Sequence, residues 1–150
     1  MAQEFPQIET ESLLVDRAVM EFVRRPESFD VVVASNLFGD ILTDLGAAIA
    51  GSMGIAPSAN LDPSRTNPSL FQAIHGSAPD IAGQGIANPL ALIMSGVMML
   101  NHLGERASAD RIKAAYDDVL AEGNPDELTR DIGGRAGTKA FTKALLKRMA

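Results

Sequence analysis

The sequence contains no cysteine and no tryptophan, and it has one tyrosine and two histidines among 150 residues. Without cysteine, disulfides, thiolate metal sites and a cysteine nucleophile are excluded. Basic residues are also few, 13 against 19 acidic ones, and the net charge is -6. Affinity for nucleic-acid phosphates comes mainly from Lys and Arg, so no nucleic-acid partner is expected. Metal cations remain candidate ligands.

A long hydrophobic run is missing as well. The longest, residues 90–100, is interrupted by Ser95 and Gly96 and is far shorter than the roughly 20 residues that cross a bilayer. The opening MAQEFPQIET has no basic stretch followed by an apolar one, so no signal peptide is predicted. We therefore expect a cytoplasmic protein with no membrane partner. A hydrophobic content of 46% with 21% charged residues is typical of a globular chain.

Hydrophobic spacing predicts an α/β protein with few strands and about five helices. The expected helices are residues 12–25, residues 36–50, a segment after Asn88-Pro89 to about Leu103, a segment with Ile112 to Leu120 on its apolar side, and a last helix capped by Thr138. The expected strands are 30–35, apolar, β-branched and buried, and 69–74. Residues 55–68 and 123–137 are predicted loops. So few strands among five helices indicate an incomplete chain.

Two aspartates on the second predicted helix are candidate metal ligands. Asp40 and Asp44 are four residues apart, which places their side chains on one face about one turn apart. Carboxylate oxygens suit Mg²⁺ or Mn²⁺. The pair follows a predicted strand directly, as ligand sites in α/β folds do. Asp16 is a third candidate. The alternative is that all three are solvated surface acids.

Residues 75–89, HGSAPDIAGQGIANP, form an expected loop with three glycines and two prolines. Gly83 to Asn88 begins like a dinucleotide fingerprint but has Asn88 in place of the third glycine. Glycines allow a ligand close to the backbone, and a helix start after Asn88 would offer free N–H groups. The loop is therefore either a nucleotide site or a structural connection.

General acid–base candidates are scarce. His102 and Tyr116 are expected to have packing or capping roles, and Met94, Met98 and Met99 to fill the core. The residues alone thus offer a candidate metal site and a candidate nucleotide loop, but no convincing acid–base machinery.

Four segments in order, SNLFGDILTDL, IAPSANLDPSRTNPSLF, HGSAPDIAGQGIANP and DIGGRAGTKAF, resemble the C-terminal part of the β-decarboxylating dehydrogenases. This family includes isopropylmalate, isocitrate, homoisocitrate and tartrate dehydrogenases. The resemblance implies their fold, with residues 1–50 in the dimerisation and metal-binding domain and 51–150 in the dinucleotide-binding domain. It also implies oxidation of a 2-hydroxy acid by NAD and decarboxylation with Mg²⁺ or Mn²⁺ in a homodimer.

The resemblance assigns roles by position. Asp40 and Asp44 correspond to metal ligands of one subunit, and Asp16 to a ligand that the partner subunit contributes. The residues corresponding to the nucleotide loop are His75, Gly76, Ser77, Ala78, Asp80, Ile81 and Asn88. Asp80-Ile81 resembles the NAD-preferring members. No catalytic residue is assigned, because the arginine cluster, tyrosine and lysine of the family are expected in a missing N-terminal part.

Two features leave the function open. The 59–71 stretch most resembles tartrate dehydrogenases, whereas the 131–141 stretch resembles isopropylmalate dehydrogenases. Gln72-Ala73 stands where most relatives read Glu-Pro, near the nicotinamide. We therefore consider three hypotheses: a C-terminal or split half of an NAD-dependent enzyme that is inactive alone, a non-catalytic nucleotide-binding or regulatory subunit, and an inactive truncated remnant.

Overall fold

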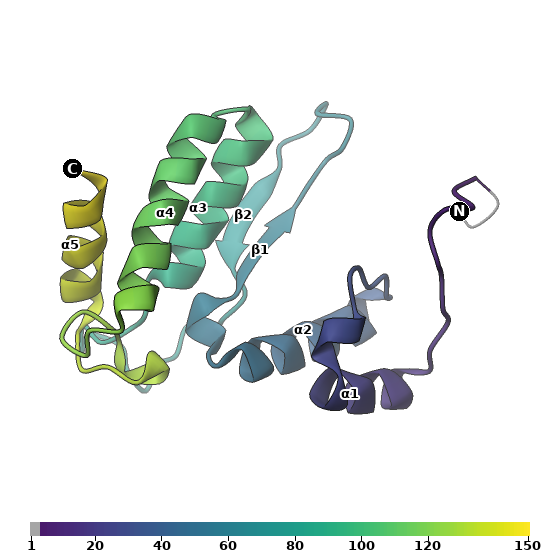
Figure 1. Ribbon diagram of the computed structural model, residues 1–150, viewed down its shortest axis with the longest axis horizontal. Coiled ribbons are helices and arrows are strands. Elements are labelled where there is room, and N and C mark those ends of the chain that lie inside the picture. Colours follow the sequence, from purple (N-terminus) through teal and green to yellow (C-terminus); the bar gives the residue numbers. More distant parts are fainter. Residues whose placement is uncertain (1–3) are drawn as a thin grey trace. The chain divides into compact units, whose positions relative to one another are not determined.

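The computed structural model describes residues 4–150, and the chain divides into two compact units at the Ile49–Ala50 bond. Figure 1 shows the helices and strands of each unit. No helix within residues 4–150 combines the length and the apolar character that crossing a bilayer requires.

The first unit is built from α1 (Val15–Arg24), the short 3₁₀ helix η1 (Pro26–Ser28) and all but the last residue of α2 (Asn36–Ala50). The α1 helix begins later than predicted and ends before Pro26, as proline requires. Its buried Glu21 accepts a hydrogen bond from Arg25 at 2.9 Å. The rings of Phe22 and Phe29 pack with centroids 4.5 Å apart. Helix α2 buries Leu42 and Ala47.

The prediction of a buried strand at 30–35 is wrong for this chain. The segment contains no strand, and Val31 and Val33 are each 86% exposed. An apolar β-branched run forms a strand only when neighbouring strands accept its backbone hydrogen bonds. The described residues of this chain provide no such neighbour, because the two strands that they contain pair with each other. The run is therefore left exposed.

The second unit begins with the 3₁₀ helix η2 (Met53–Ile55) and an antiparallel hairpin of β1 (Pro57–Asn60) and β2 (Leu70–Ala73), in which Pro57 pairs with Ala73. Strand β2 confirms the predicted strand. Strand β1 lies inside the predicted loop 55–68, so that part of the prediction is wrong. The proline-based argument failed because proline is tolerated at the first residue of a strand, where Pro57 lies.

Three helices cover the hairpin in layers: α3 (Leu90–Leu103) packs on both strands, α4 (Arg106–Glu122) packs on α3, and α5 (Thr138–Met149) packs on α4 (Figure 1). The core between them is apolar. It contains Leu90, Val97, Ala109, Ala115, Tyr116, Val119, Phe141, Ala144 and Leu145. Tyr116 therefore has the predicted packing role, and His102 packs its ring against Phe71 with centroids 5.7 Å apart.

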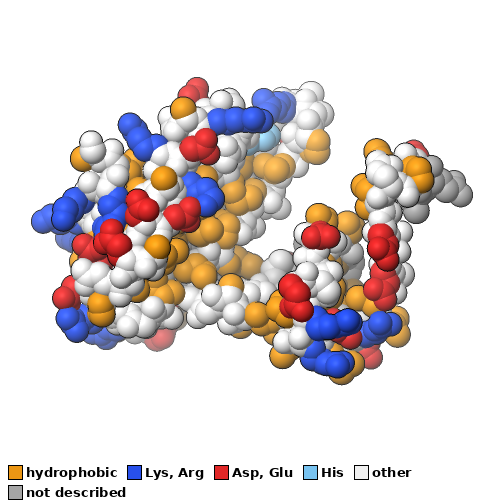
Figure 2. All heavy atoms as spheres, viewed as in Figure 1, with side chains coloured by type: hydrophobic (Ala, Val, Ile, Leu, Met, Phe, Trp, Pro, Cys, Tyr) orange, Lys and Arg blue, Asp and Glu red, His pale blue; other side chains and the backbone are white. Residues whose placement is uncertain are grey.

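Two details of these helices were predicted incorrectly. Met98 and Met99 are 37% and 39% exposed rather than core residues, because α3 covers the hairpin with one side and leaves another side uncovered. Hydrophobic side chains are visible over α3 and the hairpin, whereas charged ones cover α4 and α5 (Figure 2).

The second detail is the start of α5: Thr138 is the first residue of this helix, and Gly137, not Thr138, is its cap. The Thr138 hydroxyl instead donates to the Ala87 carbonyl.

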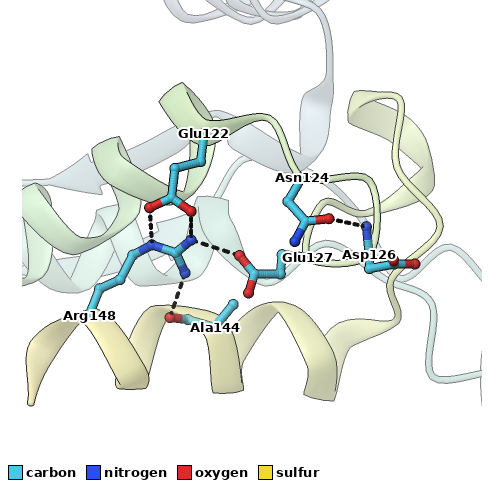
Figure 3. A network of polar contacts seen from close by, with 6 residues as sticks. All are labelled: Glu122, Asn124, Asp126, Glu127, Ala144 and Arg148. Atoms are coloured by element: carbon cyan, nitrogen blue, oxygen red, sulfur yellow. Dashed lines mark hydrogen bonds and ion pairs between the residues drawn. The ribbon is translucent and has the colours of Figure 1, made fainter.

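A charged network connects the end of α5 to the end of α4 (Figure 3). The Arg148 guanidinium donates to both Glu122 oxygens, to Glu127 Oε2 at 2.7 Å and to the Ala144 carbonyl at 3.0 Å. Glu122 and then Glu127 hold the pKa of Arg148 above its usual value. The Arg148 side chain is only 13% exposed, so the network is shielded from solvent on its arginine side.

Candidate functional site

The predicted nucleotide loop, residues 75–89, contains no helix or strand, and α3 begins directly after it. Hydrogen bonds to its own backbone hold part of the loop. The Ile81 N–H donates to the Ala78 carbonyl at 3.1 Å and the Gln84 side chain to the Asp80 carbonyl at 2.8 Å. Ala78 has a φ of 42°, a left-handed conformation uncommon outside glycine. His75 lies exposed, with Nδ1 3.0 Å from the Gly76 carbonyl oxygen.

Exposure of this loop is uneven. Residues 75–80, which include most of the residues assigned to the nucleotide, are all exposed, and Ile81 is half-buried. A Cβ added at Gly76 would meet no atom within 4 Å. The backbone of this first part is thus open to an approaching ligand.

Asn88 differs from the rest of the loop because its side chain is buried and engaged. Its Oδ1 accepts from the Leu90 N–H at 2.9 Å, and its Nδ2 donates to Asp131 Oδ2 at 2.9 Å. The sequence indicated free N–H groups at this helix start. The structure shows that the Leu90 N–H is already bonded to Asn88.

Asp131 and Ser52 are residues of this region that the sequence analysis did not single out. The Ser52 hydroxyl donates to Asp131 Oδ2 at 2.5 Å and accepts from the Gly54 N–H at 2.9 Å. Burial raises the pKa of Asp131, but the hydrogen bonds from Ser52 and Asn88 outweigh it, so this pKa lies below its usual value. Asp131 opens the DIGG stretch, but nothing in the spacing connects it to the loop. Ser52, Asn88 and Asp131 are called the Asp131 cluster below.

The candidate metal ligands all belong to the first unit. Asp40 and Asp44 are exposed on α2, and Asn36 donates to Asp40 Oδ2 at 3.5 Å. Asp16 is exposed in the first turn of α1, where its Oδ1 accepts from the Arg17 N–H at 2.8 Å. Within residues 4–150 no three acidic or histidine side chains gather as a metal-binding group. Asp40 and Asp44 are thus two exposed carboxylates four residues apart on α2, about one helical turn from each other.

Comparison with known proteins identifies the family. The family model described as isocitrate/isopropylmalate dehydrogenase matches residues 1–146. The chain belongs to the isocitrate/isopropylmalate dehydrogenase family. It is 48% identical to the isocitrate/homoisocitrate dehydrogenase of Thermus thermophilus over 98% of this chain and 42% of that protein. It is 49% identical to the probable tartrate dehydrogenase/decarboxylase of Bacillus subtilis over 99% of this chain and 41% of that protein.

A solved relative shows the same fold. The crystal structure of isocitrate dehydrogenase from Methylococcus capsulatus superimposes with a TM-score of 0.92 and 45% identity, covering 99% of this chain and 43% of that one. The chain therefore has the α/β fold of part of an isocitrate/isopropylmalate dehydrogenase, as the resemblance predicted. It spans about two fifths of the length of the relatives it matches.

Proposed function

We propose that this chain is the C-terminal half of an NAD-dependent β-decarboxylating dehydrogenase, and that it acts on a 2-hydroxy acid only together with an N-terminal half. The observation that carries the proposal is the match to this family over residues 1–146, combined with the relatives' greater length. Identity is almost the same to an isocitrate/homoisocitrate and to a tartrate enzyme, so the substrate class remains isocitrate, isopropylmalate or tartrate/malate.

The donor chemistry on α2 fits a hard divalent cation. Asp40 and Asp44 are exposed carboxylates near the start and middle of one helix, and oxygen ligands are those that Mg²⁺ and Mn²⁺ prefer. Two carboxylates leave coordination positions for substrate, water and Asp16 of a second copy. This is why we propose a homodimer in which each chain completes the other's metal site.

The open first part of the loop fits a nucleotide. Gly76, Ser77 and Ala78 would present backbone groups to it, and Asp80 would accept from ribose hydroxyls and repel a 2′-phosphate, which favours NAD. When bound, NAD supplies the hydride acceptor and the metal ion a Lewis acid. The residues of this chain bind and orient; no residue of it is proposed to transfer a proton.

The test is co-expression with an N-terminal half from a close relative. We expect NADH formation that requires Mn²⁺ or Mg²⁺ with isocitrate, isopropylmalate, tartrate or malate, and no activity from the chain alone. A folded complex that is inactive with every substrate contradicts the proposal. Asp40→Asn is the matched inactive variant, and Glu27→Gln, at an exposed acid of the same unit, is the active control.

A second candidate function is a non-catalytic nucleotide-binding subunit. Gln72 favours it, because this exposed position of β2 carries an amide in place of the family's carboxylate. In that case the complex binds NAD but forms no NADH. Replacement Gln72→Glu, with an increase in turnover, would support the enzyme instead.

A further inference from the structure

The two parts of loop 75–89 are held very differently. The first part is exposed and bonded mainly within itself. The second part is attached to α5, because the Gly85 carbonyl accepts from the Thr138 N–H at 2.9 Å and the Ala87 carbonyl accepts from the Thr138 hydroxyl. A Cβ at Gly137 would meet the Gly85 oxygen at 2.6 Å, so the approach requires glycine there.

The Asp131 cluster holds the same part of the loop from another side. One carboxylate oxygen, Asp131 Oδ2, accepts from both Ser52 and Asn88, and Asn88 in turn accepts from the Leu90 N–H. These contacts join the segment before η2, the end of the loop and η3 (Arg130–Ile132). Hydrogen bonds to an ionised acceptor are roughly twice as strong as neutral ones, so the charge of Asp131 stabilises the junction.

The atoms around the Asp131 cluster leave no room for a side chain at Gly54. A Cβ at Gly54 would lie 2.7 Å from Asp131 Oδ2, 2.9 Å from Asn88 Cβ and 3.1 Å from Ser52 Oγ. Ser52 and Asn88 can therefore both reach one oxygen only because Gly54 has no side chain. The Asn88 rotamer is fixed by partners at both ends of its amide.

We propose that Asp131 is a positioning residue for the nucleotide: it touches no ligand itself, but it holds Asn88, one of the residues assigned to the nucleotide, and the adjoining end of the loop in one conformation. This inference rests on the proposed function, because the ligand of the loop is taken to be NAD. Its physical basis is preorganisation: a loop that is already ordered loses less conformational entropy when its ligand binds.

The test compares Asp131→Ala with Asp126→Asn, a variant in the same connection whose carboxylate faces Arg135 instead. In the reconstituted complex, we expect Asp131→Ala to raise the dissociation constant and the KM for NAD about tenfold while kcat changes little. Asp126→Asn should leave both unchanged. Asp131→Asn keeps an acceptor oxygen for Asn88 but loses the charge, so its NAD affinity should lie between those of Asp131→Ala and the wild type. Unchanged NAD affinity in Asp131→Ala overturns the proposal.

A second measurement separates this inference from the proposed function. Amide hydrogen exchange in the free chain should speed up at Leu90 and residues 85–88 in Asp131→Ala, while the α4 and α5 amides stay protected. If the wild type binds no NAD but this local effect occurs, the proposed function is wrong and the positioning contact is real. If Asp131→Ala unfolds the whole unit, Ser52→Ala, which removes one donor to the same oxygen, should give a smaller increase in the NAD dissociation constant; no increase also overturns the proposal.

Discussion

The Ser95 hydroxyl of α3 lies 2.7 Å from the Gln72 carbonyl oxygen of β2. The same Oγ lies 2.9 Å from the Ala91 carbonyl oxygen and accepts from the Ser58 N–H of β1 at 3.3 Å. Ser95 is fully buried. One hydroxyl on the helix therefore connects it to both strands of the hairpin.

Replacing Ser95 with alanine should destabilise the second unit by about 1–3 kcal/mol, because buried polar groups of the strands lose their partner. Urea unfolding followed by far-UV circular dichroism measures the change. Ser108→Ala, at a half-buried position of α4, is the matched control and should have a clearly smaller effect. Equal stability of the two variants would show that the Ser95 bonds contribute nothing.

Removing Arg148 should lower the melting temperature by several degrees. Its guanidinium is shielded and bonds both Glu122 and Glu127, so Arg148→Ala leaves two carboxylates without their cation. Arg135→Ala also breaks a two-point ion pair, with Asp126, but that side chain is 69% exposed. Exposed pairs contribute little, and we expect almost no change in melting temperature. A larger effect at Arg135 than at Arg148 would contradict this ranking.

Acid should loosen the turn between β1 and β2. The Ser64 hydroxyl and the Asn67 N–H, at 2.7 and 2.7 Å, hold the pKa of the Asp62 carboxyl well below its usual value. Because the folded pKa is the lower one, this stabilisation is complete above the usual Asp pKa of about 4 and is lost as the pH falls through the folded value. Asp62→Asn should make unfolding less dependent on pH in that range. NMR titration of the carboxyl carbon checks the direction; a midpoint at or above the usual value would contradict it.

Manganese binding should depend on both α2 carboxylates. Each carboxylate would supply an oxygen ligand, so Asp40→Asn or Asp44→Asn should weaken Mn²⁺ binding to the reconstituted complex at least tenfold. Loss of a residue that only hydrogen-bonds a metal ligand already lowers metal affinity about tenfold or more, and loss of a ligand itself should cost no less. Water proton relaxation by bound Mn²⁺ measures the affinity, and Glu27→Gln, at an exposed acid of the same unit, serves as control. Undiminished binding in both variants would remove α2 from the metal site.

The exposed run at 30–35 should be where an N-terminal half attaches. Val31→Lys places a charge on a side chain that is 86% exposed in this chain but that would be buried if flanking strands pair with it. We expect the variant to fold normally alone and to fail to co-purify with the N-terminal half. Glu27→Lys, an exposed change in the nearby η1, should assemble like the wild type. Normal assembly of Val31→Lys would place the attachment elsewhere.

Local patterns predicted the helices, and strand β2, whose partners lie inside this chain, but they missed β1, the strand that pairs with β2. Tyr116 and Val119 are buried because α3 and α5 pack on α4, which the apolar spacing of α4 indicated. The same type of pattern failed at Val31 and at Met98, which are exposed. Hydrophobic spacing indicates that a face must be buried, but not which polypeptide buries it.

The polar contacts of the candidate site could be predicted even less. Asn88 was identified from its position before a helix, yet its partner Asp131 lies 43 residues further along the chain. Ser52 and Asp131 are 79 residues apart. No local spacing encodes such pairs, because they exist only once the second unit has folded.

Ser52 has a practical consequence for dissecting the molecule. It follows closely on the Ile49–Ala50 break between the two units, although its hydroxyl serves the distant Asp131. A shortened protein starting at Ala50 would keep this donor together with Gly54, whereas one starting at Pro57, at the first strand, would delete both. A protein that starts at Pro57 would thus lose the hydrogen bond from Ser52 to Asp131. Only the piece that starts at Ala50 is suitable for studying nucleotide binding in isolation.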